Sequence, residues 1–473
     1  MEFEFWYYMV RKIKFFILVP IIYMISCVSV YQDINPEDVA INQAEFSYLL
    51  YDLDNREIVS SYNEDLALMP ASILKLFTGY AALETLGYDK RFVTQIYYNG
   101  ELKNGVLHGD LILRGGGDPS LGYEDLFNIA SLIRKQQITT VTGSLVYEDD
   151  FLIAMPEINS NQPNEKYNSG LSSLVLRNNS FFLKGGVVAE NKFLIPQLDY
   201  MKFKIADDIS TPEYIKKYSW LIDGKKNYHL PIKDTSFFVA NILKQILQYN
   251  NIKISTISYH NKQGDRKLLL EYHSNPLINI LRYNLNFSHN LTSEILLLQF
   301  ASAIQCNYDD LGDAAKCLSN WYQEKFPEIS WRNLGWDNGS GLSLNTNITT
   351  LHILSLLQVL YNKQYGSDMA ISLLPVSGLS GTLKHKFLDN SLNIWAKTGN
   401  MYFVSGLAGY LFNKERRYIF IILANDKIMR ERLDNLDKEY NQKEYEYLIE
   451  YAKLWKEKIY DKQQQLIKIW LNN

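Results

Sequence analysis

Cysteine is scarce in this chain, and metal-binding patterns are absent from its sequence. The 473 residues include three cysteines, Cys27, Cys306 and Cys317, which are too few for a disulfide framework and form no CxxC or Cys/His pair with zinc spacing. No two of the seven histidines stand four positions apart, so the sequence has no HExxH zinc motif. We therefore expect neither a metal nor a cofactor.

An excess of charge of either sign is also missing. Lysine and arginine number 48, aspartate and glutamate number 52, and the formal net charge is -4. With 47% hydrophobic and 21% charged residues, the composition is typical of a folded protein. Nucleic acid is not the expected partner, because the chain has no surplus of positive charge. The length predicts one to three domains with sizeable cores.

The N-terminal apolar stretch is too short to span a membrane comfortably. Three basic residues precede "FFILVPIIYMISCVSV", which has the size of a signal-peptide core, and we interpret residues 1–27 as an export signal. The letters "MISC" loosely resemble a bacterial lipobox. Lipid attachment at Cys27, cleavage after a nearby small residue and an uncleaved anchor are the alternatives. Each places the body of the chain outside the cytoplasm, in the periplasm or at the membrane surface, where Cys306 and Cys317 could pair.

Sheet signals near both ends of the chain flank a helical middle. The first β runs surround the turn at Asp54-Asn55, the last three lie within 392–426, and a charged helix from Arg430 onward is interpreted as a solvated face. Between them the periodicity predicts helices over 69–87, 236–249, 275–286 and 291–326, with short β runs over 91–150 and an irregular polar stretch over 157–228. This order predicts an α+β fold.

One short motif carries nucleophile chemistry. In "MPASILKLFTGYAALETLG", which is predicted to form an amphipathic helix, Ser72 and Lys75 stand three positions apart and share a helix face. A serine hydroxyl is a poor nucleophile at neutral pH, and a desolvated lysine can lose its proton and act as the base. The helix N-terminus also offers N–H groups to an oxyanion. The pattern alone is weak evidence for catalysis, because serine and lysine are also common as polar surface residues at the start of a helix.

Two further motifs strengthen the catalytic interpretation of Ser72 and Lys75. The only KTG in the chain comprises Lys397, Thr398 and Gly399, at the end of a β run where a cation and a hydroxyl could hold a substrate carboxylate and glycine lets a substrate backbone come close. Four Ser-x-Asn triplets occur, at Ser61, Ser288, Ser343 and Ser391. Chain order selects Ser288 and Asn290, which lie between the other two motifs at the predicted junction of two helices.

The set SxxK, SxN and KTG, in this order, resembles the pattern of penicillin-binding proteins and β-lactamases. More closely, the chain is similar to the S13 family of D-alanyl-D-alanine carboxypeptidases/endopeptidases, the low-molecular-mass enzymes like penicillin-binding protein 4. The similarity covers "GDLILRGGGDPSL", "DNGSGLSLN" and "AKTGNMYFVSGLAGY", together with the long gap between Ser72 and Ser288. It implies a transpeptidase-like, β-lactamase-like α/β sandwich domain formed by residues 36–93 and 276–473, with smaller domains inserted at 94–275.

The resemblance also implies roles for the catalytic residues. Ser72 would be the nucleophile that forms an acyl-enzyme and Lys75 its general base. Ser288 would pass the proton to the leaving nitrogen, and Asn290 would hydrogen-bond the backbone amide of the substrate. His289, at the variable middle position, is expected to point away.

The substrate-binding residues implied by the resemblance belong to one strand. Lys397 and Thr398 would hold the terminal carboxylate, Gly399 completes the KTG motif, and the backbone N–H groups of Asn400 and Ser72 would form the oxyanion hole. The implied activity is serine-type hydrolysis of D-Ala-D-Ala bonds in peptidoglycan stem peptides and crosslinks, and β-lactam antibiotics would bind the same site. A β-lactamase or esterase with the same motifs, and a non-catalytic peptidoglycan-binding protein, are the alternatives.

The chain departs from the family pattern at one recognition position. Leu344 follows "GSGLS" where the family often has an arginine that grips the diamino acid of the donor peptide. Leucine offers no charge, so we expect weak discrimination, below about tenfold, between a free and an amidated carboxylate there. Glu148, Asp149 and Asp150 are the candidate readers of the free amine, with a solvated acidic turn as the alternative.

Overall fold

The computed structural model describes residues 45–160, 164–177, 179–185, 200–206, 212–216, 218–259, 265–331, 334–436 and 441–472. The predicted export signal and Cys27 therefore lie outside the described residues. Among the residues inside them, no helix has the length and apolar character needed to cross a membrane.

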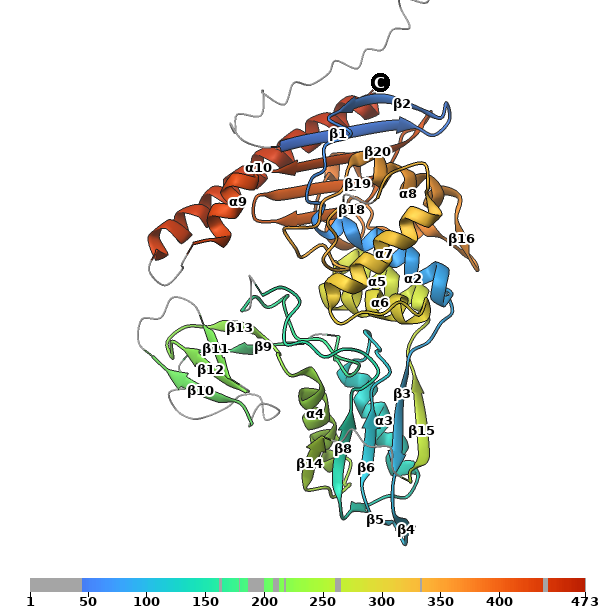
Figure 1. Cartoon of the computed structure of the whole chain (residues 1–473), viewed down its shortest axis with the longest axis vertical. Coiled ribbons are helices and arrows are strands. Elements are labelled where there is room, and N and C mark those ends of the chain that lie inside the picture. Colours follow the sequence, from blue (N-terminus) through green and yellow to red (C-terminus); the bar gives the residue numbers. More distant parts are fainter. Residues whose placement is uncertain are drawn as a thin grey trace, which may run out of the picture.

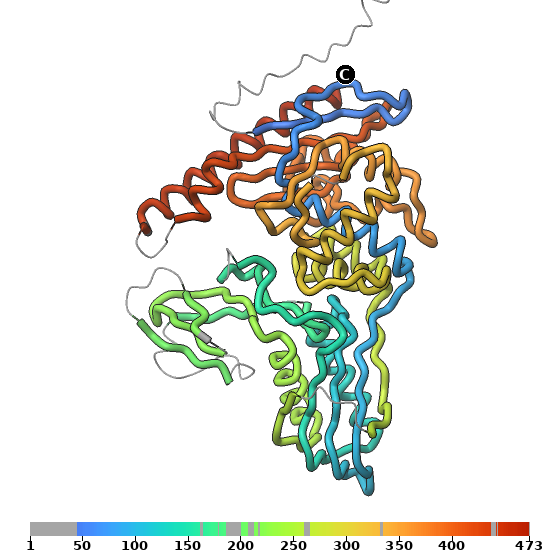
Figure 2. Tube along the Cα trace, viewed as in Figure 1, coloured from blue at the N-terminus to red at the C-terminus, as the bar shows by residue number. Residues whose placement is uncertain are grey.

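An antiparallel sheet built from both ends of the chain forms the upper part of the molecule (Figure 1). Its order is β18-β19-β20-β1-β2, so the first and last strands of the chain pair along their whole length, as Figure 2 also shows. The strands are β1 (Glu45–Asp52), β2 (Glu57–Tyr62), β18 (Ile394–Met401), β19 (Val404–Phe412) and β20 (Arg417–Asn425). Strands β1, β19 and β20 are apolar along most of their length because both faces of the sheet are covered.

One face of this sheet is covered by the C-terminal helix α10 (Gln442–Asn472), which follows α9 (Lys427–Asp434). Trp455 and Trp470 of α10 are fully buried, and Trp470 lies against Tyr48 of β1. The interpretation of this charged segment as a solvated face is therefore incomplete. The charged residues of α10 alternate with an apolar stripe, and that stripe packs against the sheet and completes the core.

A group of helices covers the other face. These helices are α2 (Lys75–Leu86), α5 (Leu277–Phe287), α6 (Asn290–Ala303), α7 (Leu311–Lys325) and α8 (Thr350–Asn362), with the 3-10 helices η2 (Ala71–Leu74), η4 (Ala370–Leu373), η5 (Gly381–Leu383) and η6 (Leu388–Asn390) and the short pair β16 (Gln364–Tyr365) and β17 (Asp368–Met369). Cys306 and Cys317, in the loop before α7 and in α7 itself, form a disulfide, the pairing that the sequence left open.

Helix α2 differs from the expected amphipathic helix. Its first nine residues, from Lys75 to Leu83, are all buried, because α6 packs against it on one side and the sheet lies on the other. A helix that is enclosed on all sides buries its polar residues as well. Lys75 is thereby forced into an interior that desolvates its charge.

The middle of the chain forms a second unit below the helices (Figure 1). Its sheet has the order β14-β8-β6-β3-β15, and smaller sheets lie beside it. The strands are β3 (Val93–Tyr98), β4 (Glu101–Lys103), β5 (Val106–His108), β6 (Leu111–Arg114), β7 (Thr140–Val141), β8 (Ser144–Glu148), β9 (Ser180–Leu183), β10 (Lys202–Ile205), β11 (Glu213–Lys216), β12 (Ser219–Ile222), β13 (Tyr228–Pro231), β14 (Thr256–Tyr259) and β15 (Lys267–His273), and the helices are α3 (Tyr123–Lys135) and α4 (Thr235–Tyr249).

This unit has a core of its own, and the chain enters and leaves it through neighbouring strands. Val93 at the start of β3 is paired with His273 at the end of β15. Side chains from α3, α4 and the sheet form a hydrophobic cluster separate from those above. This arrangement supports the predicted division into residues 36–93 and 276–473 with an insertion at 94–275, which stays a prediction at the level of its boundaries.

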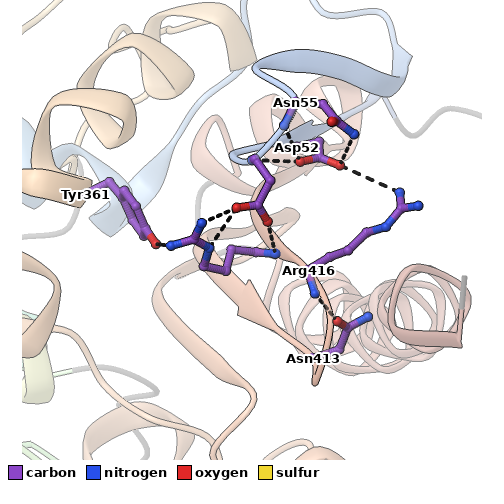
Figure 3. Close-up of polar contacts among 7 residues, drawn as sticks. Asp52, Asn55, Tyr361, Asn413 and Arg416 are labelled. Atoms are coloured by element: carbon purple, nitrogen blue, oxygen red, sulfur yellow. Dashed lines mark hydrogen bonds and ion pairs between the residues drawn. The ribbon is translucent and has the colours of Figure 1, made fainter.

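The β1–β2 and β19–β20 turns, at one end of the strands of the upper sheet, are held together by charged side chains (Figure 3). Asp52 accepts hydrogen bonds from the backbone of Asp54 and Asn55 in the β1–β2 turn and lies 3.7 Å from Arg416. Arg417 pairs with Asp54 and donates to the Tyr361 hydroxyl at 3.2 Å. The turn predicted at Asp54-Asn55 is thus tied to the β19–β20 turn, which fixes β1 against the rest of the sheet.

Candidate active site

Residues of the SxxK and SxN motifs line one cleft of about 390 Å³, and the KTG triplet adjoins it through Asn400 and through the contact of Lys397 with Ser288. Ser72 lies on η2, Lys75 begins α2, Ser288 and Asn290 lie at the junction of α5 and α6, and the KTG triplet lies in the edge strand β18. The residues that line the cleft are Ser72, Tyr167, Ser288, Asn290, Gly341, Leu342, Asn400, Met401, Tyr402, Arg430, Ala452, Lys453 and Lys456.

The lysine and the serine are in direct contact. Lys75 is fully buried, and its ammonium donates to Ser72 Oγ, to Asn290 Oδ1 and to the carbonyl of Ser340, each at 2.8 Å. Desolvation by burial lowers the pKa of Lys75 to about 7. Near neutral pH a large fraction of this lysine is therefore uncharged, and a neutral amine 2.8 Å from a hydroxyl can accept its proton.

Glu294 opposes this effect. It is fully buried on α6 and accepts hydrogen bonds from the backbone N–H groups of Gly339 at 2.7 Å and Ser340 at 2.9 Å. Burial raises the pKa of Glu294, whereas its charge raises the pKa of Lys75. Sequence reasoning missed this residue. Its signal was a single acid in an otherwise apolar helix, four positions after Asn290 and so on the same helix face.

The backbone before Ser72 is held by close contacts. Ala71 has a φ of 45°, in the left-handed region that favours glycine. A Cβ on Gly399 would lie 2.3 Å from the carbonyl of Pro70 and 3.2 Å from the N–H of Ser72. The backbone that comes close to Gly399 is the turn that carries the nucleophile candidate. The predicted approach of a substrate backbone to this glycine stays a prediction.

Ser288 bridges the SxN and KTG motifs. It ends α5 with a φ of 58°, and Lys397 donates to its Oγ at 2.9 Å. Asn290 accepts from Lys75 on one side and donates to the carbonyl of Tyr167 at 3.3 Å on the other. His289 bonds Thr292 at 3.0 Å, and burial lowers its pKa to about 4, so it is a neutral imidazole outside the cleft lining.

The KTG side chains point from β18 into the same network. Lys397 is fully buried, and its pKa lies well below the usual lysine value because of burial and because Lys75 and Lys386 are close. Thr398 donates to the hydroxyl of Thr382 at 3.0 Å. An anion placed between Lys397 and Thr398 would favour the protonated form of Lys397 and would meet two hydroxyl groups, which is the composition of a carboxylate-binding site.

Other sequence candidates lie elsewhere. Glu148 pairs with Arg266, and Asp149 accepts from Ser236 at 2.5 Å beside a separate cavity, so the structure places neither on the active-site cleft. Asp150 lies 3.5 Å from Arg114, also away from the cleft. The expectation that these acids read a substrate amine is therefore wrong, because β8 ends inside the inserted unit.

Within the described part of the polar stretch at 157–228, Tyr167 is the residue that lines the cleft, and Asn159 donates to the carbonyl of Leu342, another lining residue, at 2.9 Å. Tyr167 lines the cleft, and its pKa is raised by burial and by the nearby Glu165 and Tyr402. Nothing in the local sequence indicated this contact. Among the described residues, no cluster of three or more His, Cys, Asp or Glu side chains could hold a metal ion.

Comparison with known proteins decides the family. The model of the D-Ala-D-Ala carboxypeptidase 3 (S13) family matches residues 33–192 and 223–445. The chain belongs to this family. It is 23% identical to D-alanyl-D-alanine carboxypeptidase DacB of Haemophilus influenzae, over 81% of this chain and 86% of that one. It is 24% identical to the D-alanyl-D-alanine carboxypeptidase of Actinomadura sp. (strain R39), over 82% and 79%.

Solved structures agree on the fold. The crystal structure of penicillin binding protein 4 (dacB) from Haemophilus influenzae matches with a TM-score of 0.73 at 22% identity, over 83% of this chain and 93% of that one. The predicted α+β, penicillin-binding fold and the predicted class, a serine-type D-Ala-D-Ala carboxypeptidase of the S13 family, are confirmed.

Proposed function

We propose that Ser72 is the nucleophile that cleaves D-Ala-D-Ala bonds of peptidoglycan stem peptides, and that Lys75 is its base. The observation that carries the proposal is the contact of 2.8 Å between Lys75 Nζ and Ser72 Oγ, together with a lysine pKa of about 7. A serine beside a lysine that is largely neutral at physiological pH is an activated nucleophile.

The acylation step follows from the positions of the groups. Ser72 Oγ attacks the carbonyl carbon while its proton passes to Lys75 Nζ. The oxyanion that develops is stabilised by the backbone N–H groups of Ser72 and Asn400. As the C–N bond breaks, the proton that Lys75 accepted is delivered to the leaving nitrogen through Ser288, so Lys75 is neutral again at the end of the step. Lys397 Nζ, 2.9 Å from Ser288 Oγ, orients this hydroxyl and keeps its own proton.

Substrate binding in this proposal uses the outer edge of β18 beyond Ala396, because the first half of that edge is paired with residues 375–377. An extended peptide lies along the strand, with its terminal carboxylate between Lys397 and Thr398 and a backbone amide near Asn290. Gly399 keeps β18 close to η2, which aligns Ser72 with Asn400. Water then hydrolyses the acyl-enzyme. The same chemistry opens both pentapeptide monomers and crosslinks, so we propose carboxypeptidase and endopeptidase activity.

β-Lactam antibiotics are expected to acylate Ser72, because their strained amide and carboxylate resemble the D-Ala-D-Ala terminus. We further propose that the chain works outside the cytoplasm, where peptidoglycan lies. Lipid attachment at Cys27 would hold it at a membrane surface. A Cys27→Ser variant tests the anchor: release into the soluble fraction supports it, and unchanged fractionation points to plain cleavage.

The test of the activity is digestion of purified muropeptides followed by mass spectrometry. Loss of one D-alanine from pentapeptide monomers and conversion of crosslinked dimers into monomers are expected. Fast turnover of nitrocefin without any change in the muropeptides would favour the β-lactamase alternative. A wild-type protein that leaves both substrates intact would favour the non-catalytic binding protein.

A further inference from the structure

One end of the active-site cleft is lined by cations. Beyond Asn400 the cleft continues past Met401 and Tyr402, at the turn after β18, and is bounded by Arg430 from α9 and by Lys453 and Lys456 from α10. Helix α10 belongs to the last part of the chain, and the local sequence gave no sign that it reaches the cleft.

These cations differ in how far they are neutralised. Arg430 is buried and donates to both carboxylate oxygens of Asp434, at 2.9 and 2.8 Å, so its charge is compensated. Lys453 lies 3.2 Å from Glu450, and both side chains are exposed. An exposed pair of this kind is weak and can exchange its partner for another anion.

Lys456 is exposed where α10 borders the cleft, and it has no ion-pair partner among the residues that the structure describes. Partial desolvation by the surrounding protein lowers its pKa. The neighbouring Lys386 also has a lowered pKa, because it is partly buried and because Lys456 carries a like charge close to it. Its ammonium lies 5.6 Å from the centre of the Tyr460 ring. Holding two lysines of like charge close together costs free energy. An anion bound beside Lys456 in the cleft would offset part of that cost.

The position along the strand tells which part of the substrate this end of the cleft meets. If Lys397 and Thr398 hold the terminal carboxylate and Asn400 the oxyanion, then Met401 and Tyr402 follow on the acyl side of the scissile bond. Leu344, where the family pattern has an arginine, packs with Met401 against an apolar cluster of Met69, Ala71 and Val404. It contributes no charge to this end.

We propose that Lys456, assisted by Lys453, forms an anion subsite that binds a carboxylate of the stem peptide on the acyl side of the scissile bond. The proposal rests on the proposed function, because it takes the position of the acyl side from Ser72 and the KTG strand. In place of the weak discrimination expected from Leu344, it predicts a preference for a carboxylate-bearing substrate, determined by the C-terminal helix α10.

A pair of penicillins that differ by one carboxylate tests the proposal. Carbenicillin carries a carboxylate on the side chain where benzylpenicillin has hydrogen, and that side chain lies on the acyl side of the ring amide. The measurement is the ratio of the two second-order acylation rates. We expect Lys456→Gln to lower the ratio of carbenicillin to benzylpenicillin by about tenfold, which corresponds to ~1.4 kcal/mol. Lys456→Glu is expected to lower it further, and Lys453→Gln by less.

Because the measurement is a ratio, it cancels effects of a substitution that slow both acylation rates equally, such as a changed electrostatic potential at Lys397 or a partly misfolded protein. Lys458→Gln, an exposed lysine of the same helix that does not line the cleft, is the matched control and should leave the ratio unchanged. An unchanged ratio in both Lys456 variants would overturn the subsite. Failure of the wild-type protein to react with either penicillin would instead overturn the proposed function.

Discussion

The protonation of Lys75 should set the pH dependence of acylation. With a pKa of about 7, the base is about half neutral at pH 7, about 9% neutral at pH 6 and about 1% neutral at pH 5. The pKa is lowered, so the active form is lost as the pH falls. We therefore expect the rate of acylation by benzylpenicillin to drop about fivefold from pH 7 to pH 6 and to level off above pH 8.

Replacing Glu294 shifts this curve in a defined direction. The Glu294 charge raises the pKa of Lys75, so Glu294→Gln should lower it, by about one unit for a nearby opposite charge. At pH 6 the variant should then retain about half of its own maximal rate, where the wild type retains about a tenth. A glutamine offers one oxygen to the two N–H groups of Gly339 and Ser340, so the maximal rate itself is also expected to fall.

The assay measures the rate of acylation by a fluorescent penicillin between pH 5 and pH 9, by stopped-flow or on gels. The quantity compared is the pH at which the rate falls to half of its maximum, not the maximal rate itself. Glu271→Gln is the control, because Glu271 lies on β15 in the inserted unit and bonds Gln95. A flat profile between pH 5 and pH 8, a midpoint above pH 9, or a midpoint that rises in Glu294→Gln would refute the reasoning.

Three further predictions concern the carboxylate site, the nucleophile turn and the disulfide. Lys397→Ala should lower acylation by about a hundredfold or more, since it removes both the carboxylate partner and the contact with Ser288; a rate near that of the wild type would remove Lys397 from this role. Gly399→Ala should lower the rate by at least about tenfold with the lysine pKa unchanged, because the new Cβ would displace the Pro70 carbonyl 2.3 Å away; a rate-neutral variant would show that the turn adapts. Replacing Cys306 and Cys317 by alanine should lower the free energy of unfolding by about 2–3 kcal/mol, as for a short closed loop, and an unchanged denaturation midpoint would contradict this.

The sequence predicted the parts of the site that are local in the chain or ordered along it. The spacing of Ser72 and Lys75 placed them on one helix face, and chain order selected Ser288 and Asn290 among four similar triplets. Strands β18, β19 and β20 were likewise predicted from their apolar runs. In each case a short pattern determines a local structure, and one sheet edge brings the three motifs together.

The remaining features depend on contacts between distant segments. Glu294 faces Lys75 across two helices, Tyr167 reaches the cleft from the inserted unit, and Lys456 arrives on the last helix. No short pattern encodes such proximity. The close approach of Gly399 to the neighbouring turn is also a contact between distant segments. The error over Asp149 has the same origin, because this residue follows β8 and lines a different cavity.

Every step of the proposed reaction starts from Ser72, so the direct measurement is peptide mapping by mass spectrometry after incubation with benzylpenicillin. We expect a single penicilloyl adduct on the peptide that contains Ser72, formed by the wild type and absent in Ser72→Ala. The folded state of that variant is checked by its unfolding midpoint, which should match the wild type. Labelling that persists in Ser72→Ala, or an adduct on any other serine, would contradict the assignment of the nucleophile.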